Sequence, residues 1–346
     1  MPEQKHHKVL KFVKSNPSLS SKEIYDGLRS SMGYATVKRI LKSLSSEKLI
    51  ITEGSGRGTK YKTGPAYDLF YPIDVDDYFS HEIDERAIRK DFNFSLISNL
   101  LREIELFKEN EIQHLTTLQT RFTEKKLKLS KTAYAKELER LSIDLSWKSS
   151  QIEGNTYSLL ETERLLKEKE TAAGKTKDEA IMLLNHKDAI DFILSDPNYL
   201  FPLDLLKIEK LHTLLMNGLG IESGIRTTTI GITGTNYKPL EYEQLIRKAL
   251  REMCTLVNQH PGVFEKAFLL LVLISYIQPF IDGNKRTARI LSNAALINRG
   301  YCPISFRTVD TLDFKKALLL FYEQNNLTAI KKIFIDQYDF AVNTYF

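Results

Sequence analysis

The chain has little cysteine and no long apolar run, and both absences narrow the kind of protein it can be. Cys254 and Cys302 are its only cysteines, and neither has a partner at the spacing of metal ligands or redox pairs. Zinc and disulfide chemistry are therefore not indicated. The longest apolar run, residues 267–277, includes a serine and is too short to cross a bilayer, so it predicts a buried helix. The N-terminal residues lack the apolar core of a signal peptide, so we expect a cytoplasmic protein.

Charge is distributed unevenly along the 346 residues. Residues 1–65 contain thirteen Lys and Arg against five Asp and Glu, a balance of +8, whereas the whole chain carries +5 and the remainder therefore −3. With 42% hydrophobic residues the chain can bury a large core, and its length suggests two or three units. The excess of cations at one end predicts a small basic unit suited to nucleic acid.

The basic segment has the pattern of three short helices followed by a hairpin. Ser20 and Glu23 have the spacing of a capping box, and a further helical pattern over 34–50 separates apolar residues from cations. Residues 50–63 predict two short strands around a glycine-rich turn. This order resembles a winged helix-turn-helix domain, which we place at residues 1–65; a solvated basic face and a protein-docking module are the alternatives. The residues that would contact DNA phosphates or base edges are Thr36, Lys38, Arg39, Lys42 and Arg57.

The remainder of the chain predicts a linker and a helical body. Pro72 and a cluster of aspartates are expected to interrupt any helix within residues 66–90, which we assign to a linker. Over residues 91–346 apolar side chains recur three and four apart beneath charged faces. This pattern predicts a mainly α domain with its core at about residues 140–320.

One segment of the helical body has strand character. Residues 227–232 are rich in β-branched side chains, and Gly234 and Asn236 follow in a turn. The pattern predicts a β-hairpin over residues 227–238.

A polar loop lies between the apolar run and the next helical pattern and reads QPFIDGNKRTAR, residues 278–289. Pro279 forces the residue before it out of helical geometry, so the chain must turn before a second helix begins. Unpaired amides in the first turn of that helix attract anions, together with the helix dipole. Arg286 and Arg289 lie three apart on one face and can lean over the same anion. The loop predicts a cradle for a polyphosphate, with Asp282 as an oxygen ligand for Mg²⁺; an ordinary capped helix with solvated arginines is the alternative.

The same loop resembles the Fic-domain motif, His-x-Phe-x-Asp/Glu-Gly-Asn-Gly-Arg-x-x-Arg. The positions that match are Phe280, Asp282, Gly283, Asn284, Arg286 and Arg289. The resemblance covers about residues 90–320 and implies a helical Fic core with a β-hairpin flap. It also implies transfer of the AMP of ATP, with Mg²⁺, to a hydroxyl of a target protein.

By position, the resemblance gives a role to each part of the site. Phe280 would anchor the loop in the core, and Asp282 would bind Mg²⁺. The residues that would hold the phosphates of ATP are Gly283, Asn284, Lys285, Arg286 and Arg289. The flap, which would align the target segment by strand addition, contains Thr229, Ile230, Gly231 and Ile232.

A second motif precedes the first. Ser149 and Glu153 are one helical turn apart, and Gly154 suits a helix end. The trio resembles the inhibitory Ser/Thr-x-x-x-Glu-Gly/Asn signature found in one class of Fic proteins. The resemblance implies that Glu153 pairs with Arg289 and takes the place of the γ-phosphate. By itself, the pattern would indicate only a capped helix end.

Two positions depart from the Fic motif. Gln278 replaces the histidine that acts as general base, and an amide can orient a hydroxyl but accepts no proton at neutral pH. His212 and His260 are the candidate substitutes, but structural or exposed roles are favoured for both, and nothing in the sequence places His212 in the loop. Lys285 stands where the motif has glycine. A related branch of the family with lysine at this position phosphorylates its targets, but it lacks the second arginine of the motif. Because this chain retains that arginine as Arg289, AMP transfer is favoured.

Three hypotheses for the function follow. The first is a protein adenylyltransferase that uses ATP and Mg²⁺, is autoinhibited by Glu153 and is impaired by Gln278. The second is a catalytically inactive regulator in which nucleotide binding changes how residues 1–65 bind DNA. The third is a scaffold whose cradle stays plugged by Glu153. The expected partners are a target protein and DNA; a homodimer is compatible with each hypothesis, and no membrane partner is expected.

Overall fold

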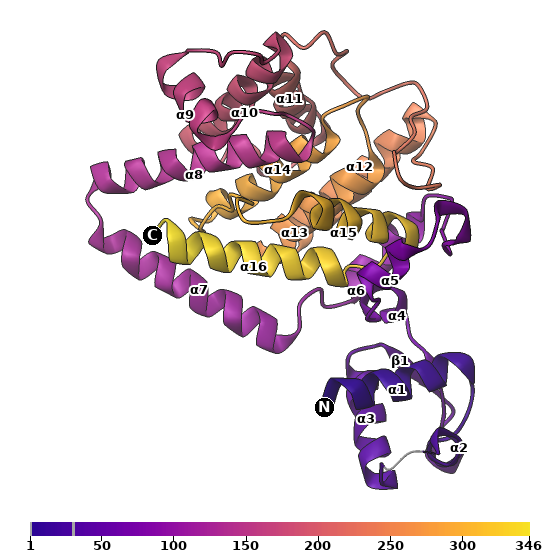
Figure 1. The fold of residues 1–346 in the computed structure, drawn as a ribbon. Helices are drawn as coiled ribbons and strands as arrows, with labels where there is room; N and C mark the ends of the chain where they lie inside the picture. The colour runs from indigo at the N-terminus through magenta and orange to yellow at the C-terminus, as the bar shows by residue number, and fades with distance from the viewer. Residues whose placement is uncertain (1, 30–31) are drawn as a thin grey trace.

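A computed structural model describes residues 2–29 and 32–346 and shows a small N-terminal unit joined to a large helical body (Figure 1). The N-terminal unit contains helices and an antiparallel pair of strands: α1 (Pro2–Ser15), α2 (Ser21–Leu28), α3 (Tyr34–Ser46), β1 (Ile50–Glu53) and β2 (Lys60–Thr63). A 3₁₀ turn, Gly56–Gly58, lies between the two strands. This element order is the one expected of a winged helix-turn-helix, and that assignment stays a prediction.

Local chemistry explains why these elements form. The amide of Glu23 donates to Ser20 Oγ at 3.3 Å and the amide of Ser20 donates to Glu23 Oε2 at 2.7 Å, so a capping box starts α2. On α3 the cations are exposed, whereas the buried residues are Val37, Ile40, Leu41 and Leu44. Ile50 of β1 lies opposite Thr63 of β2, which fixes the register of the hairpin.

The acidic cluster of the linker starts a helix instead of interrupting one. Residues 66–90 contain two short helices, α4 (Tyr67–Phe70) and α5 (Val75–Ser80), and a 3₁₀ turn, Ile83–Glu85. Asp74 Oδ1 accepts from the amides of Asp76 and Asp77 at 3.1 Å each. Aspartate is favoured as an N-cap and in the first turn, because it satisfies free amides and the helix dipole. The expectation of a helix-free linker is therefore wrong.

The helical body packs around α13. Its elements are a π-helical turn (Leu96–Leu100), α6 (Leu101–Glu103), α7 (Glu109–Lys128), α8 (Lys131–Ile152), α9 (Leu159–Glu168), α10 (Lys177–Ser195), α11 (Leu205–Met216), α12 (Glu243–Gln259), α13 (Val263–Ile277), α14 (Asn284–Asn298), α15 (Thr311–Gln324) and α16 (Thr328–Thr344). The predicted mainly α fold is confirmed.

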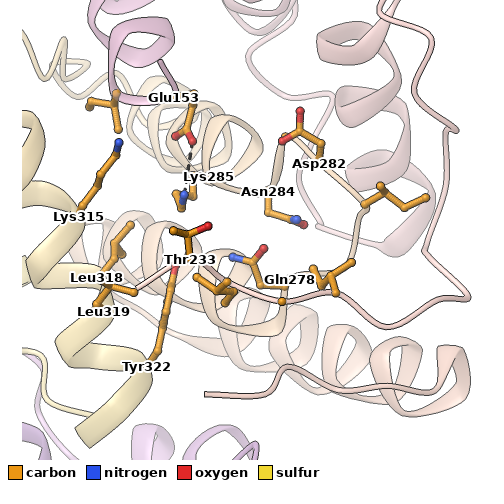
Figure 2. A pocket seen from close by; sticks show the side chains of 16 residues that line it. Glu153, Thr233, Gln278, Asp282, Asn284, Lys285, Lys315, Leu318, Leu319 and Tyr322 are labelled. Carbon is orange, nitrogen blue, oxygen red and sulfur yellow. Dashed lines mark hydrogen bonds and ion pairs between the residues drawn. The ribbon is translucent and has the colours of Figure 1, made fainter. Parts of the chain in front are cut away.

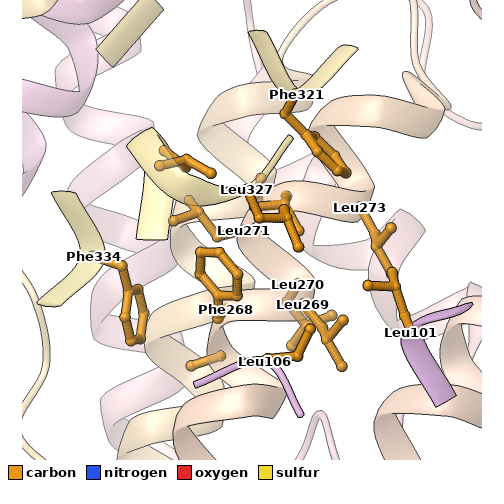
Figure 3. Packing of buried hydrophobic residues seen from close by; sticks show 14 of the residues in the cluster. Leu101, Leu106, Phe268, Leu269, Leu270, Leu271, Leu273, Phe321, Leu327 and Phe334 are labelled. Carbon is orange, nitrogen blue, oxygen red and sulfur yellow. The ribbon is translucent and has the colours of Figure 1, made fainter. Parts of the chain in front are cut away.

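The core of the body supports the polar loop that follows α13. Residues 267–274 of α13 are fully buried, and Figure 3 shows Phe268 packed among leucines, with Phe321 of α15 and Phe334 of α16 nearby. Each such side chain stabilises the fold by about 1.5–3 kcal/mol through burial. Because α14 packs closely on α13, the loop between them is held at both ends by the core. Among the described residues, no helix combines the length and apolarity needed to cross a bilayer.

The predicted β-hairpin over residues 227–238 is wrong. Residues 221–240, all of which the structure describes, contain no strand, and only a turn forms at Thr233 and Gly234. The guanidinium of Arg226 instead donates to the carbonyls of Thr228 at 2.7 Å and Leu240 at 2.5 Å. These bonds fasten the two ends of an extended loop without a ladder. We keep the name flap for residues 227–240.

Candidate functional site

The loop between α13 and α14 is closed by its own side chains. Gln278 has left-handed backbone angles, φ 50° and ψ 60°, and ends α13. Asn284 Oδ1 accepts from the amide of Phe280 at 2.9 Å, while its Nδ2 donates to the carbonyl of the same residue at 2.8 Å. Gly283 has φ 77°, a backbone conformation that favours glycine, and a Cβ there would also displace the end of the Met216 side chain, whose Cε would lie 2.5 Å away. The amides that begin α14 are thereby presented on a fixed turn.

His212 lies against this loop, although nothing in the sequence placed it there. Its ring stacks on Phe280 with centroids 3.6 Å apart, and its Nε2 donates to the carbonyl of Asp282 at 3.0 Å. Burial lowers the pKa of His212 to about 4, so the ring is neutral at pH 7. His212 does not line the cavity described below and supports the loop from behind. His260 accepts from the amide of Gly262 at 3.2 Å and is also remote from the cavity lining.

Arg286 and Arg289, at the start of α14 just after the loop, are both buried. Arg286 Nη2 donates to Asp282 Oδ2 at 2.9 Å. Arg289 donates from Nε to Ser149 Oγ at 2.7 Å, and from Nη2 to the carbonyl of Ser149 at 3.0 Å and to Glu153 Oε1 at 2.7 Å. Within the described residues, Arg286 Nε and Nη1 and Arg289 Nη1 have no hydrogen-bond partner although they are buried. Buried donors of this kind are suited to an anion.

Glu153 sits among the cations of the loop. Its Oε2 lies 3.4 Å from Lys285 Nζ, in addition to the bond with Arg289. Burial by itself raises the pKa of Glu153, but Arg289 and Lys285 outweigh burial and hold the pKa below its usual range. The carboxylate is therefore charged at neutral pH and is the local counterion of both cations.

A cavity of about 480 Å³ opens over the loop (Figure 2). Glu153 from the end of α8 and the turn Asp282–Lys285 form one wall, and flap residues 230–233 and α15 form the others. Gln278 also lines the cavity, is 5% exposed, and donates from Nε2 to the carbonyl of Ser275 at 2.6 Å. The cavity size is within the ordinary range of small-molecule sites.

The structure gathers most of the site residues expected from sequence into this cavity. Those that line it are Glu153, Ile230, Gly231, Ile232, Gln278, Asp282, Gly283, Asn284 and Lys285. Ser149, Arg286 and Arg289 lie behind the lining, and Thr229 is exposed outside it. The residues of α15 were not expected from the sequence: Lys315, Leu318, Leu319 and Tyr322. Their pattern in the sequence indicates only an amphipathic helix. Because α15 is separated from the loop in the chain, the sequence does not show that the two lie side by side.

Arg226 is a further residue that sequence reasoning missed. It is 2% exposed, its Nε donates to the carbonyl of Gln278 at 2.8 Å, and its amide donates to the carbonyl of Pro279 at 2.9 Å. Together with its bonds to the flap, these contacts tie the flap to the loop. A lone arginine among β-branched residues was the only signal in the sequence.

Three of the predicted DNA-contacting residues line one groove of the N-terminal unit. Lys38, Arg39 and Lys42 of α3 line a groove with Thr52 of β1 and Tyr61 of β2. Thr36 is half-buried and does not line this groove, and the side chain of Arg57 lies outside the described residues. Cations from α3 therefore face the hairpin across a shared groove.

Comparison with known proteins agrees with the fold and the loop. Residues 202–296, which include the whole loop, match the family model described as Fic/DOC family. A protein adenylyltransferase Fic of Nematostella vectensis is 29% identical over 178 residues, which is 49% of this chain and 41% of that protein. One from Drosophila erecta is 30% identical over 158 residues, 44% of this chain and 32% of that protein.

Solved structures show the same architecture. Fic-1 (residues 134–508) from C. elegans superposes with a TM-score of 0.59 at 18% identity, over 68% of this chain and 71% of that one. A Fic domain containing signaling protein from Bacteroides thetaiotaomicron gives 0.55 at 18% identity, over 67% and 93%. The fold of the body is thus the Fic fold, and the match to the family model is confined to residues 202–296. It spans less than half the length of the curated relatives it matches.

Proposed function

We propose that the chain is a protein adenylyltransferase that binds ATP and Mg²⁺ in the cavity over the loop and transfers AMP to a hydroxyl of a target protein. The observation that carries the proposal is the contact of Glu153 with Arg289 at 2.7 Å and Lys285 at 3.4 Å, because a carboxylate there occupies a site built for an anion. The names of the relatives favour the same activity.

The residues present fit ATP and Mg²⁺. The loop offers the free amides that begin α14, and Arg286 and Arg289 keep three buried nitrogens without a partner in the described residues. Asp282 is 57% exposed at its side chain and can offer an oxygen to a hard cation beside the phosphates. No group of three or more His, Cys, Asp or Glu gathers as a metal site in the described chain, so phosphate and water oxygens would complete the shell. ATP supplies the adenylyl group, and Mg²⁺ offsets the charge of its phosphates.

Glu153 provides the inhibition in this proposal. Its charged carboxylate covers Arg289, which is fully buried, and shares Lys285. A γ-phosphate must displace this carboxylate to reach the same guanidinium, and two anions in one place repel each other. Any event that withdraws the end of α8 therefore frees the cradle.

Gln278 slows the chemistry in this proposal. Its side chain lines the cavity, where the acceptor hydroxyl must give up its proton, and none of the described histidines lines it. An amide oxygen accepts a hydrogen bond but does not become protonated at pH 7, and loss of a general base costs about 10²- to 10⁴-fold in rate. The remaining positioning and charge stabilisation support slow transfer.

The position of the label in ATP tests the proposed reaction. The Glu153→Gly variant, incubated with Mg²⁺ and ATP labelled at the α-phosphate, should label itself or added proteins, and γ-labelled ATP should not. Because Arg289 is retained, we expect ATP to bind with its α-phosphate toward Gln278. Adding Asp282→Ala to the same variant should remove the label. Transfer of the γ-label instead would show phosphorylation and contradict the proposal.

A catalytically inactive, nucleotide-sensing regulator of DNA binding is the second candidate. Two observations favour it: the amide of Gln278 is occupied by the carbonyl of Ser275, and three cations of α3 line one groove, where they could contact phosphates. In this proposal ATP changes how tightly the N-terminal unit holds DNA. A homodimer and a cytoplasmic location stay predictions.

Salt dependence tests the DNA proposal. Binding to duplex DNA should weaken steeply as salt rises, because phosphate contacts release counterions. Lys42→Ala should lower the slope of log Kd against log salt by about 1, the contribution of one phosphate contact. Lys22→Ala is the matched control, since Lys22 lies on α2 and pairs with Asp26 at 3.1 Å. Equal slopes for the two variants would contradict a DNA-binding groove at α3.

A further inference from the structure

The tip of the flap is held by the linker that precedes the helical body. Arg86 Nη2 donates to the carbonyl of Gly234 at 2.8 Å. Next to it, Asn236 Nδ2 donates to Asp84 Oδ1 at 2.9 Å, and the amide of Lys238 donates to the carbonyl of Lys90 at 2.8 Å. We call Asp84, Arg86 and Lys90 the linker latch. It contacts the flap at every second residue from 234 to 238.

Arg86 is fixed on α15 before it reaches the flap. Its Nη1 lies 3.2 Å from Glu323 Oε1, and the two side chains are 4% and 0% exposed. Tyr78 Oη donates to the other carboxylate oxygen of Glu323 at 2.7 Å, and the Arg86 guanidinium lies 5.0 Å from the ring centroid of Phe79. A buried, paired guanidinium has little freedom to move. Arg86 is thus a rigid bridge from α15 to the flap.

This bridge sets the distance between two walls of the cavity. Flap residues 230–233 line the cavity immediately before Gly234. On α15, Leu318, Leu319 and Tyr322 line it and precede Glu323 in the chain. The flap tip also packs on α15, because a Cβ at Gly234 would meet Leu319 Cδ1 at 3.4 Å. The flap has no ladder of its own, and three anchors hold it over the cavity. Arg226 bonds its ends, the buried Tyr237 donates from Oη to the carbonyl of Tyr276 at 3.0 Å, and the latch bonds its tip.

We propose that the linker latch positions the flap, and that Arg86 is the positioning residue through which the linker aligns the acceptor segment with the bound nucleotide. The part concerning the acceptor rests on the proposed function. The mechanical part, that the linker holds the flap tip, does not.

Two substitutions release the flap while sparing the buried charge pair. Arg86→Lys keeps a cation beside Glu323, but one ammonium cannot reproduce the fork that reaches both Glu323 and the carbonyl of Gly234. Asp84→Ala removes the acceptor for Asn236 at an exposed position. The matched control is Asp76→Ala, which breaks the 2.8 Å ion pair of Asp76 with Lys316, another contact between linker and α15 that does not touch the flap.

Hydrogen exchange measures the mechanical part. In the full chain carrying Arg86→Lys and Asp84→Ala, amides of residues 227–238 should exchange about tenfold faster, because two hydrogen bonds at the tip are lost. The amide of Lys238 bonds the carbonyl of Lys90, which neither substitution removes, so its exchange reports whether the tip separates from the linker. Exchange in α13 and the melting temperature should stay close to those of the parent, and Asp76→Ala should leave the flap unchanged. Equal exchange of the flap in all three chains would overturn the proposal.

Transfer kinetics measure the part concerning the acceptor. In a background of Glu153→Gly and Gln278→His, the latch variant should lower the rate at saturating ATP by about 10- to 100-fold, because small misplacement of reacting groups is costly. The Kd for ATP, measured by calorimetry with Mg²⁺, should change less than about threefold, since the phosphates are held by the loop. A parallel loss of ATP affinity and rate would overturn the assignment of Arg86 to the acceptor. If the background itself fails to transfer AMP, the proposed function fails, and hydrogen exchange alone decides the latch.

Discussion

Replacing Gln278 by histidine should raise the rate of AMP transfer about 10²- to 10⁴-fold in a chain that also carries Glu153→Gly. The backbone of the loop can accept histidine at position 278 without rearrangement, for two reasons. The carbonyl of Gln278 is held by Arg226 at 2.8 Å, so the backbone stays in place when the side chain changes. Histidine tolerates the left-handed conformation at φ 50° better than most residues. An imidazole at this position can accept the proton of the attacking hydroxyl, which the amide cannot.

The measurement is the initial rate of label transfer from α-labelled ATP at saturating concentration. Gln278→Leu in the same background is the control, because it has a similar size and also lacks a base; it should match the slow parent or fall below it. The rate of the histidine variant should rise with pH and level off above the pKa of the new imidazole, near 6.5 when unperturbed. A histidine variant no faster than the leucine variant would show that the missing base does not limit transfer.

Removing the Glu153 carboxylate should tighten ATP binding by about 100-fold. In the parent chain ATP has to displace charge-assisted contacts with Arg289 and Lys285, each worth roughly 1.5–3 kcal/mol, and approaches a carboxylate of its own sign. Glu153→Gly frees the guanidinium and the ammonium, and about 2.7 kcal/mol of recovered binding corresponds to this factor. Calorimetry with ATP and Mg²⁺ gives the two Kd values directly.

Two further variants serve as controls. One distinguishes the charge of the Glu153 side chain from its volume, and the other tests whether loss of any carboxylate affects ATP binding. Glu153→Gln keeps the shape of the side chain without its charge, so its Kd should lie between those of the parent and the glycine variant. Glu163→Gln removes an exposed carboxylate that pairs with Lys167 at 2.6 Å on α9, and should leave the Kd unchanged. An ATP affinity of Glu153→Gly equal to that of Glu163→Gln would argue against a plugged cradle.

The flap shows where sequence patterns mislead. Its β-branched residues favour a strand locally, and β-propensity depends on a partner that the sequence does not specify. Within the described part of the chain no strand pairs with the flap; Arg226 bonds the carbonyls of Thr228 and Leu240, and Arg86 bonds that of Gly234. For the acidic linker the sequence predicted too little structure. Aspartates disfavour the interior of a helix but favour its first turn, and the position of Asp74 as N-cap places them in the first turn of α5.

The sequence by itself determined the features whose contacts are local. Pro279 and Gly283 dictate a turn into a helix, the spacing of Arg286 and Arg289 puts them on one face, and the apolar run requires a buried helix in front of them. Only the tertiary structure decided which distant groups complete the site. Arg289 meets Ser149 and Glu153 across more than 130 residues, and Arg86 meets Glu323 across more than 230. Such contacts depend on how helices pack, and packing is fixed by the whole core at once, whereas a turn or a helix face is fixed by neighbours in the chain.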